Sequence, residues 1–214
     1  MDRLPRGRHG LSPEFVARNQ RQRLISALIL TLADVGYQKT TVSMIGRRAA
    51  VSKSDFYKHF ESKDECFLAA YDHAIDRLRG AVIEACAKVD GEAWPARVRA
   101  GIVALLGLLS AEPALAAILL AEGLRAGRGI YDRYQAAVES FVPLLRRGAP
   151  EPPGGGEVPP ATDEAVVGGI ASLLSRRAIA GEAAGLAALT PDVLEFALTP
   201  HLGTEAARRI ISAG

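Results

Sequence analysis

The chain has 214 residues, a net charge of +2 and a hydrophobic share of 49%, which together exclude a disordered polypeptide. Few residues are aromatic (6%), and long stretches lack the alternating β-branched pattern of strands, so the composition predicts an all-helical protein. Residues 1–64 hold 12 Lys and Arg against 6 Asp and Glu, whereas residues 65–214 hold 14 against 18, and this imbalance indicates that the first third meets a polyanion.

Residues 1–89 predict a basic arm and four helices. Residues 1–11 show no periodicity and are expected to form a flexible arm. Ser12 followed by Pro13 is typical of a helix start, and Gly36 of a helix end. The later helix starts are predicted at Thr41, at Ser52, and at the Ser62–Glu65 capping box. These signals place helices over residues 12–35, 40–50, 52–60 and 62–89.

The remainder predicts further helices and one linker. Apolar periodicity places helices over residues 95–110, 113–126 and 130–147. Residues 148–161 are rich in Gly and Pro and are expected to be a surface linker. Thr162 and Asp163 are expected to cap a helix that runs to Leu189, and another begins at Thr190. The Thr199–Pro200 pair is expected to interrupt that helix before a final short one.

The two short helices between Thr40 and Phe60 carry the strongest functional signal. Phe56 and Phe60 are one turn apart, so they lie on one face of the third helix and hold it to the scaffold. The opposite face then presents Lys53, Tyr57 and their polar neighbours. A short helix with an apolar inner face and a Lys/Ser/Tyr/Lys outer face suits the major groove of DNA.

The residues of this segment resemble a known family. The run TTVSMIGRRAAVS (residues 40–52), then FYKHF (56–60) and SKDE (62–65), resembles the DNA-binding domain of the TetR family of bacterial regulators. The resemblance spans about residues 18–70. It implies an N-terminal three-helix DNA-binding domain over residues 12–61, with a helix-turn-helix, and a larger C-terminal helical domain over residues 62–214.

The resemblance also implies roles for individual residues. Thr41 and Lys63 correspond to phosphate contacts, Lys63 through its main-chain N–H, and Lys53 corresponds to a base-reading residue. The full implied set for DNA is Thr41, Ser43, Arg47, Arg48, Ser52, Lys53, Ser54, Asp55, Tyr57, Lys58, His59 and Lys63. Within this set, capping of the third helix is favoured over base contact for Asp55.

Two residues depart from the pattern of the family. Ala50 stands where the family usually has a glycine in the turn, which costs about 1 kcal/mol if that residue needs a positive φ. Gly46 replaces the usual alanine one turn earlier, at a helix-propensity cost of about 1 kcal/mol. The turn is therefore expected to pack differently.

Sites in the larger domain follow from the resemblance and are less specific. The ligand pocket is expected among the middle helices, and its mainly Leu, Ile and Ala side chains favour a small apolar effector. Its candidate residues are Trp94, Leu105, Leu109, Ile118, Glu122, Tyr131, Tyr134 and Phe141. A two-fold dimer is expected through the last helices, where small residues permit close approach. Its candidate residues are Leu173, Leu174, Arg177, Gly181, Leu194 and Leu198. Ordinary core packing is the alternative for both sets.

The sequence gives little support for a disulfide, a metal site or a catalytic site. Cys66 and Cys86 fall on one predicted helix, too far apart to pair, which is typical of a reduced, cytoplasmic protein. Asp72, His73 and Asp76 are interpreted as a solvated helix face rather than metal ligands, and His9 and His201 as isolated surface groups. No catalytic constellation, cofactor motif or stretch apolar enough to span a membrane is expected.

These observations predict a homodimeric, ligand-responsive repressor that binds a palindromic operator. A DNA-binding regulator without a small-molecule effector is the main alternative. A helical enzyme is the second alternative, and the lack of candidate catalytic groups speaks against it.

Overall fold

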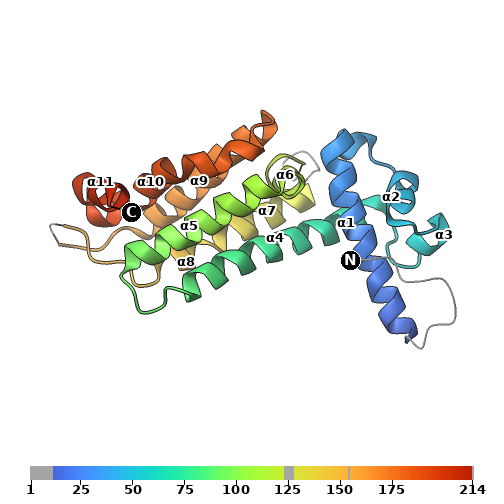
Figure 1. The fold of residues 1–214 in the computed structure, drawn as a ribbon, viewed down its shortest axis with the longest axis horizontal. Coiled ribbons are helices and arrows are strands. Elements are labelled where there is room, and N and C mark those ends of the chain that lie inside the picture. Colours follow the sequence, from blue (N-terminus) through green and yellow to red (C-terminus); the bar gives the residue numbers. More distant parts are fainter. Residues whose placement is uncertain (1–11, 123–127, 154, 214) are drawn as a thin grey trace. The chain divides into compact units, whose positions relative to one another are not determined.

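The computed structural model describes residues 12–122, 128–153 and 155–213, and every regular element in these ranges is helical (Figure 1). Contacts divide the chain into two compact units, of which the first ends at Ala74 and the second begins at Ile75. This boundary falls inside helix α4 (Lys63–Ala87). The predicted basic arm over residues 1–11 lies outside the described ranges.

The first unit packs helices α1 (Pro13–Lys39), α2 (Val42–Ala49) and α3 (Lys53–Phe56) with the start of α4. The predicted helix starts are confirmed, because the hydroxyls of Ser12, Thr41 and Ser52 each accept a hydrogen bond from a first-turn N–H. Gly36 adopts φ 75° and breaks the helical path of α1 as predicted. The core of the unit consists of fully buried side chains, namely Leu24, Leu28, Ile45, Phe56, Phe67 and Ala70.

The second unit contains the remaining helices. They are α5 (Trp94–Ala111), α6 (Pro113–Ala116), the π-helix η1 (Ala117–Glu122), α7 (Arg128–Glu139), α8 (Val142–Arg146), α9 (Pro160–Ile179), the 3₁₀-helix η2 (Ala183–Leu189), α10 (Thr190–Leu202) and α11 (Thr204–Ser212). The α5 helix packs against η2 and α10, and α9 packs against η1. Residues 149–159, apart from 154, form the non-helical connection predicted before α9.

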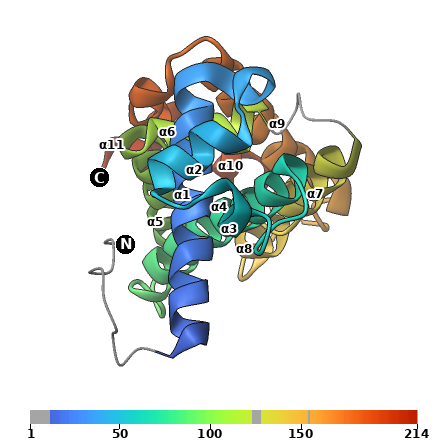
Figure 2. The ribbon, with the colours of Figure 1, turned by 90° about the vertical axis from the view of Figure 1, so that its right-hand side faces the viewer.

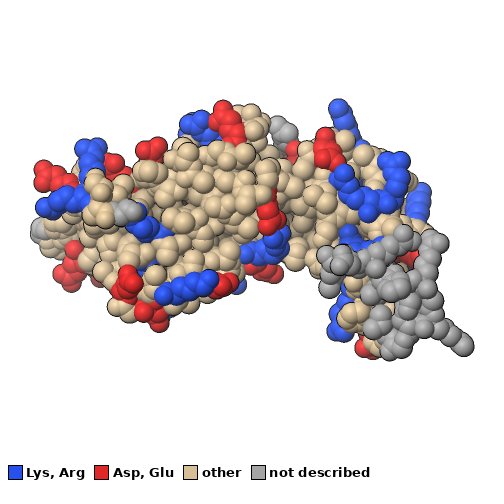
Figure 3. Space-filling model, viewed as in Figure 1, with Lys and Arg blue, Asp and Glu red and all other residues tan. Residues whose placement is uncertain are grey.

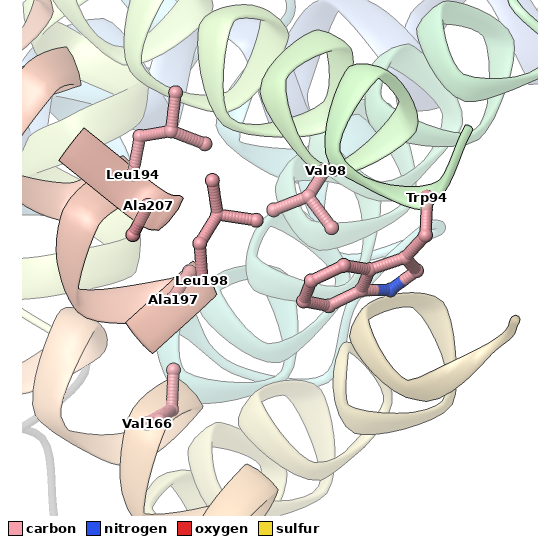
Figure 4. Close-up of a cluster of buried hydrophobic side chains, with 7 residues drawn as sticks. All are labelled: Trp94, Val98, Val166, Leu194, Ala197, Leu198 and Ala207. Carbon is pink, nitrogen blue, oxygen red and sulfur yellow. The ribbon is translucent and has the colours of Figure 1, made fainter. Parts of the chain in front are cut away.

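A cluster of buried side chains joins four helices of the second unit (Figure 4). Trp94 and Val98 of α5 face Leu198 of α10, and the indole Nε1–H of Trp94 donates to the carbonyl of Leu145 at 2.7 Å. The cluster is completed by Val166, Leu194, Ala197 and Ala207. Each of these helices therefore buries its apolar face inside the unit.

Several predicted helix limits are wrong, and proline and glycine account for most of the differences. The predicted helix over residues 130–147 is two helices, because α8 starts anew at Val142 with Pro143 in its first turn. The predicted helix over 162–189 is broken by Gly181, which adopts φ 81°. Pro200 does not interrupt α10 but lies inside it, and Gly203 ends the helix with φ 76°. The helix from Ser52 ends at Phe56 rather than near Phe60.

His201 corrects the expectation of an isolated surface histidine. Its side chain is buried in the last turn of α10, and its Nε2–H donates to Asp163 Oδ1 at 2.8 Å. Asp163 is itself fully buried in the first turn of α9. It therefore bonds to a side chain of another helix and does not cap α9, which begins at Pro160.

Helix α5 corrects the expectation about membrane-spanning stretches. Its 18 residues have a mean hydropathy of 1.2, which is long and apolar enough to cross a membrane by length and composition alone. One such helix is weak evidence for a membrane span. Five of its residues are buried inside the second unit, among them Trp94 and Leu106, whereas Val103 is half exposed.

Candidate nucleic-acid interface

Helix α2 presents polar groups at its start and cations at its end. The Thr41 hydroxyl accepts from the Met44 N–H at 3.3 Å, and Ser43 is exposed. Arg47 is exposed, and Arg48 forms an ion pair with Asp34 at 2.5 Å. Since exposed pairs of this kind contribute little to stability, Arg48 is available for exchange with a phosphate.

The turn after α2 accommodates both departures from the family pattern. Ala50 adopts φ 50° and ψ 47°, so this residue does need a positive φ and the cost of an alanine applies. A Cβ on Gly46 would lie 2.8 Å from the Val51 carbonyl oxygen, too close for any side chain. The Val51 N–H also donates to the Gly46 carbonyl at 2.9 Å. Glycine at 46 therefore permits the close approach of the backbone that follows the left-handed alanine.

Helix α3 is held at its start by a small polar network. The Ser52 hydroxyl accepts from the Asp55 N–H at 3.0 Å and donates to Asp55 Oδ2 at 2.7 Å. Lys58 Nζ donates to Asp55 Oδ1 at 2.7 Å. The bond from Lys58 and then that from Ser52 lower the pKa of the Asp55 carboxyl. Asp55 thus acts as a cap and a partner for Lys58, in line with the favoured interpretation.

The two faces of α3 and its following turn are chemically opposite. Phe56 and Phe60 are 0% and 2% exposed, with ring centroids 5.6 Å apart, and they fix the segment to the unit. Tyr57 is 50% exposed, and Lys53 and its neighbours also reach the surface. Figure 2 views the first unit from the side that carries α2 and α3, and Figure 3 shows Lys and Arg side chains over this unit.

His59 and Lys63 are held by residues of α1. The His59 Nε2–H donates to Gln20 Oε1 at 3.1 Å. Partial burial, with the nearby cation of Arg21, lowers the pKa of His59 and favours its neutral form. Lys63 Nζ donates to the Tyr37 carbonyl at 3.0 Å and lies 4.0 Å from the centroid of the Tyr37 ring. Lys63 can therefore offer a phosphate its main-chain N–H at the start of α4, while its ammonium group stays with Tyr37.

The structure brings the predicted DNA-facing residues together on α2, α3, the turns beside them and the start of α4. Nine of the twelve are exposed, and Asp55, His59 and Lys63 are partly buried. The nine are Thr41, Ser43, Arg47, Arg48, Ser52, Lys53, Ser54, Tyr57 and Lys58. The arrangement offers cations, hydroxyls and a phenol, which are groups that bind phosphates and base edges.

The candidate pocket residues do not form one group. Trp94 belongs to the packed core cluster, in line with the alternative of ordinary core packing, and Tyr131 is half exposed. Leu109, Ile118 and Glu122 are buried. Leu105, Tyr134 and Phe141 are partly buried. Only the buried residues of α5 and η1 remain suitable for an enclosed apolar site.

The candidate dimer residues also divide. Leu174, Leu194 and Leu198 are buried inside their own protomer, so their assignment to a surface interface is corrected. Leu173 is partly buried, while Gly181 is exposed. Arg177, also exposed, pairs with Glu182 at 2.7 Å. Apolar residues look alike in a sequence whether their own chain or a partner covers them, which is why the pattern misassigned these leucines.

Sequence reasoning missed several residues of α1 that position the interface. Gln20 bonds to His59, and Tyr37 holds Lys63 and donates its hydroxyl proton to Asp64. Burial and then the Asp64 carboxylate raise the pKa of Tyr37. Arg23 donates to the carbonyls of Ala49 and Ala50. These contacts join residues 26 to 39 positions apart, and no local spacing rule indicates them.

Within the described ranges, no group of three His, Cys, Asp or Glu side chains is arranged to hold a metal ion. His73, considered above as a metal ligand, instead lies with its Nε2 3.0 Å from Gln22 Nε2. The cations and hydroxyls of α2 and α3 are therefore the clearest candidate binding surface.

Comparisons with known proteins agree with this geometry. Residues 24–70 match the family model described as bacterial regulatory proteins, tetR family. No curated protein sequence matches the chain.

Solved structures share the fold over most of the chain. The fatty acid degradation regulator FadR from Bacillus halodurans has a TM-score of 0.71 at 16% identity, covering 89% of this chain and 97% of that one. FadR from Bacillus subtilis, solved in complex with stearoyl-CoA, has a TM-score of 0.70 at 15% identity, covering 84% and 98%. A TetR-like transcriptional regulator from Rhodococcus sp. RHA1 has a TM-score of 0.62 at 20% identity, covering 92% and 97%.

The matched segment lies within the first unit. It contains the caps at Thr41 and Ser52, the turn at Ala50 with its positive φ, and helix α3. These features identify residues 24–70 as a DNA-binding domain of the tetR family of bacterial regulatory proteins, and hence the protein as a DNA-binding transcriptional regulator.

Proposed function

We propose that this protein is a ligand-responsive repressor that binds a palindromic operator as a homodimer. The observation that carries the proposal is the two-faced segment from Ser52 to Phe60, with Phe56 and Phe60 buried and Tyr57 exposed. Residues 12–61 form the DNA-binding domain in this proposal, and residues 62–214 form the effector-binding and dimerisation domain. As a regulator of bacterial operators, the protein works in the cytoplasm.

Contact with DNA follows from the charge and position of the exposed groups. Lys53, Ser54 and Tyr57 reach base edges or nearby phosphates when α3 enters the major groove. Arg47 and Lys58 add phosphate contacts, and Lys58 exchanges its partner Asp55 for DNA. The start of α4 at Lys63 directs main-chain N–H groups and the positive end of the helix dipole toward a phosphate.

Dimerisation through α9 and α10 is supported by their exposed apolar surface. Phe196 of α10 is 50% exposed and Ile179 of α9 is 47% exposed. A Cβ on the exposed Gly169 would lie 3.1 Å from Phe196 Cε1, so the phenyl ring lies directly against α9. Two such surfaces related by a two-fold axis would bury both rings. We expect Phe196→Asp to give a monomer by sedimentation, while Ile83→Asp, at an equally exposed site of α4, leaves the dimer intact.

An apolar effector is supported by the buried residues of α5 and η1. Leu109 and Ile118 are buried, and so is Glu122, an acid in the π-helix η1. π-Helical turns are frequent at functional sites because they interrupt regular packing. The solved complex of Bacillus subtilis FadR with stearoyl-CoA gives a precedent for an apolar effector in this fold. Effector and DNA would then oppose each other through a coupling of about 1–3 kcal/mol.

The test begins with DNA. Purified protein is footprinted on the DNA beside its own coding region, where we expect protection of a palindrome. A failure to protect or bind any duplex would contradict the proposal.

A thermal-shift screen of fatty acids, acyl-CoAs and other apolar compounds then separates a ligand-responsive regulator from one without an effector. A compound that raises the melting temperature and releases DNA supports an effector, whereas operator binding without any such compound supports a regulator that has none.

A further inference from the structure

The turn between α2 and α3 contains an unusual backbone conformation. Ala50, at φ 50° and ψ 47°, is the one residue other than glycine with a positive φ in the described ranges. An alanine adopts this left-handed conformation about tenfold less often than the right-handed one. Because the direction of α3 depends on this residue, some other contact must hold Ala50 in the left-handed region.

Arg23 of α1 makes that contact. Its Nη2 donates to the Ala49 carbonyl and, at 3.1 Å, to the Ala50 carbonyl. These carbonyls belong to the two peptide planes on either side of the Ala50 Cα. Their relative orientation is set by φ and ψ of Ala50, so one nitrogen that binds both oxygens restrains the combination of these two angles.

The chemistry of the contact suits this role. The last carbonyls of α2 lack partners within the helix and carry partial negative charge. A guanidinium group is always protonated and carries no acceptor, so it can only donate to these carbonyls. Arg23 thereby stabilises a positive φ at position 50, which a glycine there would adopt without strain.

We propose that Arg23 is a positioning residue for DNA recognition, which holds Ala50 left-handed and so sets the direction of α3. The proposal rests on the proposed function for its DNA readout. The competing role for Arg23 is a direct contact with a phosphate. The two roles predict different effects of Ala50→Gly on the affinity of the Arg23→Gln variant.

The experiment is a double-mutant cycle of Arg23→Gln and Ala50→Gly, with operator affinity measured over a range of salt concentrations. Arg18→Gln, an exposed α1 arginine away from the turn, is the matched control for loss of one charge. We expect Arg23→Gln to weaken operator binding about tenfold. Ala50→Gly alone leaves binding near that of the unchanged protein, and in the Arg23→Gln background it restores most of the lost affinity.

Two outcomes would overturn the proposal. Unchanged binding by Arg23→Gln would show that the contact positions nothing. Weaker binding that Ala50→Gly does not restore, with a salt slope reduced by about one, would assign Arg23 to a phosphate.

A stability measurement keeps the proposal testable if Arg23→Gln folds poorly. Ala50→Gly must then recover much of the lost melting temperature, and it must slow hydrogen exchange of the Val51 N–H, which bonds to Gly46. No recovery would contradict the proposal. If the unchanged protein binds no DNA, the proposed function fails, while recovery of stability would still establish that Arg23 orders the turn.

Discussion

His201 in the last turn of α10 donates a hydrogen bond to Asp163 in the first turn of α9, with 2.8 Å between Nε2 and Oδ1. Both side chains are buried, and the imidazole ring lies 4.9 Å from the ring of Trp94. Arg146 Nε approaches the other carboxylate oxygen at 3.5 Å. Four elements of the second unit thus meet at one polar contact within an apolar core.

Removal of one partner of this contact is expected to destabilise the second unit strongly. Asp163→Ala leaves the buried imidazole without its acceptor, and we expect a loss of about 3 kcal/mol in the free energy of unfolding, measured with urea. The exposed pair of Glu195 and Arg208, also 2.8 Å apart, is the control. Glu195→Ala should cost less than about 1 kcal/mol, and equal losses at the two sites would contradict the importance of burial.

Glycine-to-alanine substitutions at Gly46 and Gly80 should have opposite signs. Alanine is the better helix former by about 1 kcal/mol, and a Cβ on Gly80 in α4 meets nothing within 4 Å. Gly80→Ala should therefore raise the urea midpoint. Gly46→Ala places a Cβ 2.8 Å from the backbone oxygen of Val51 and should lower the midpoint. A stabilised Gly46→Ala protein would show that the turn relaxes freely, against the close approach described here.

Operator binding should strengthen as the pH falls from 8 toward 6. Burial lowers the pKa of His59 in the free protein, so its imidazole is neutral near pH 7.5. A phosphate beside His59 would favour the protonated form and raise this pKa on binding, so DNA binding takes up a proton. A rise of one pKa unit in the complex gives up to about tenfold in affinity between the two pKa values.

The control for this prediction is His59→Gln, which cannot titrate but can still donate to Gln20. Its affinity should change less across the same pH range. The free protein should respond in the opposite direction: because a lowered pKa disfavours the imidazolium, folding stability falls as the pH drops below about 6.5. Identical pH profiles for the two proteins would exclude His59 from the phosphate contacts.

The two cysteines should differ in reactivity. Burial raises the pKa of Cys66 to about 12, while Cys86 is partly exposed, with its thiol proton directed at the Arg97 carbonyl. The thiolate is the reactive species, so at pH 8 about one Cys66 in ten thousand is reactive even when reached. We expect iodoacetamide to label Cys86 in the native protein, slowly because burial also raises its pKa, and Cys66 only after unfolding. Equal labelling of both native thiols would contradict the packing of Cys66.

Local signals predicted the helix starts and the buried phenylalanines of the candidate interface. The caps at Ser12, Thr41 and Ser52 depend on spacings of three residues, and Phe56 and Phe60 are four residues apart. Such patterns lie within one helical turn, so they are visible in a single sequence.

Long-range contacts could not be predicted in the same way. Asp163 and His201 are 38 residues apart, and neither has a neighbour that indicates the other. Leu194 and Leu198 were expected at a dimer interface, yet they pack within their own protomer, because helical periodicity identifies a buried face and not what buries it.

The most direct test of the account compares operator binding by the unchanged protein and by a folded protein with both Tyr57→Ala and Lys58→Ala. Lys88→Ala removes an equally exposed lysine just after α4, which pairs with Glu84, and serves as the control. The double variant should lose operator affinity and show a flatter dependence of affinity on salt, while the control keeps both. Full affinity and an unchanged salt slope in the double variant would contradict the assignment of α3 and its following turn to DNA.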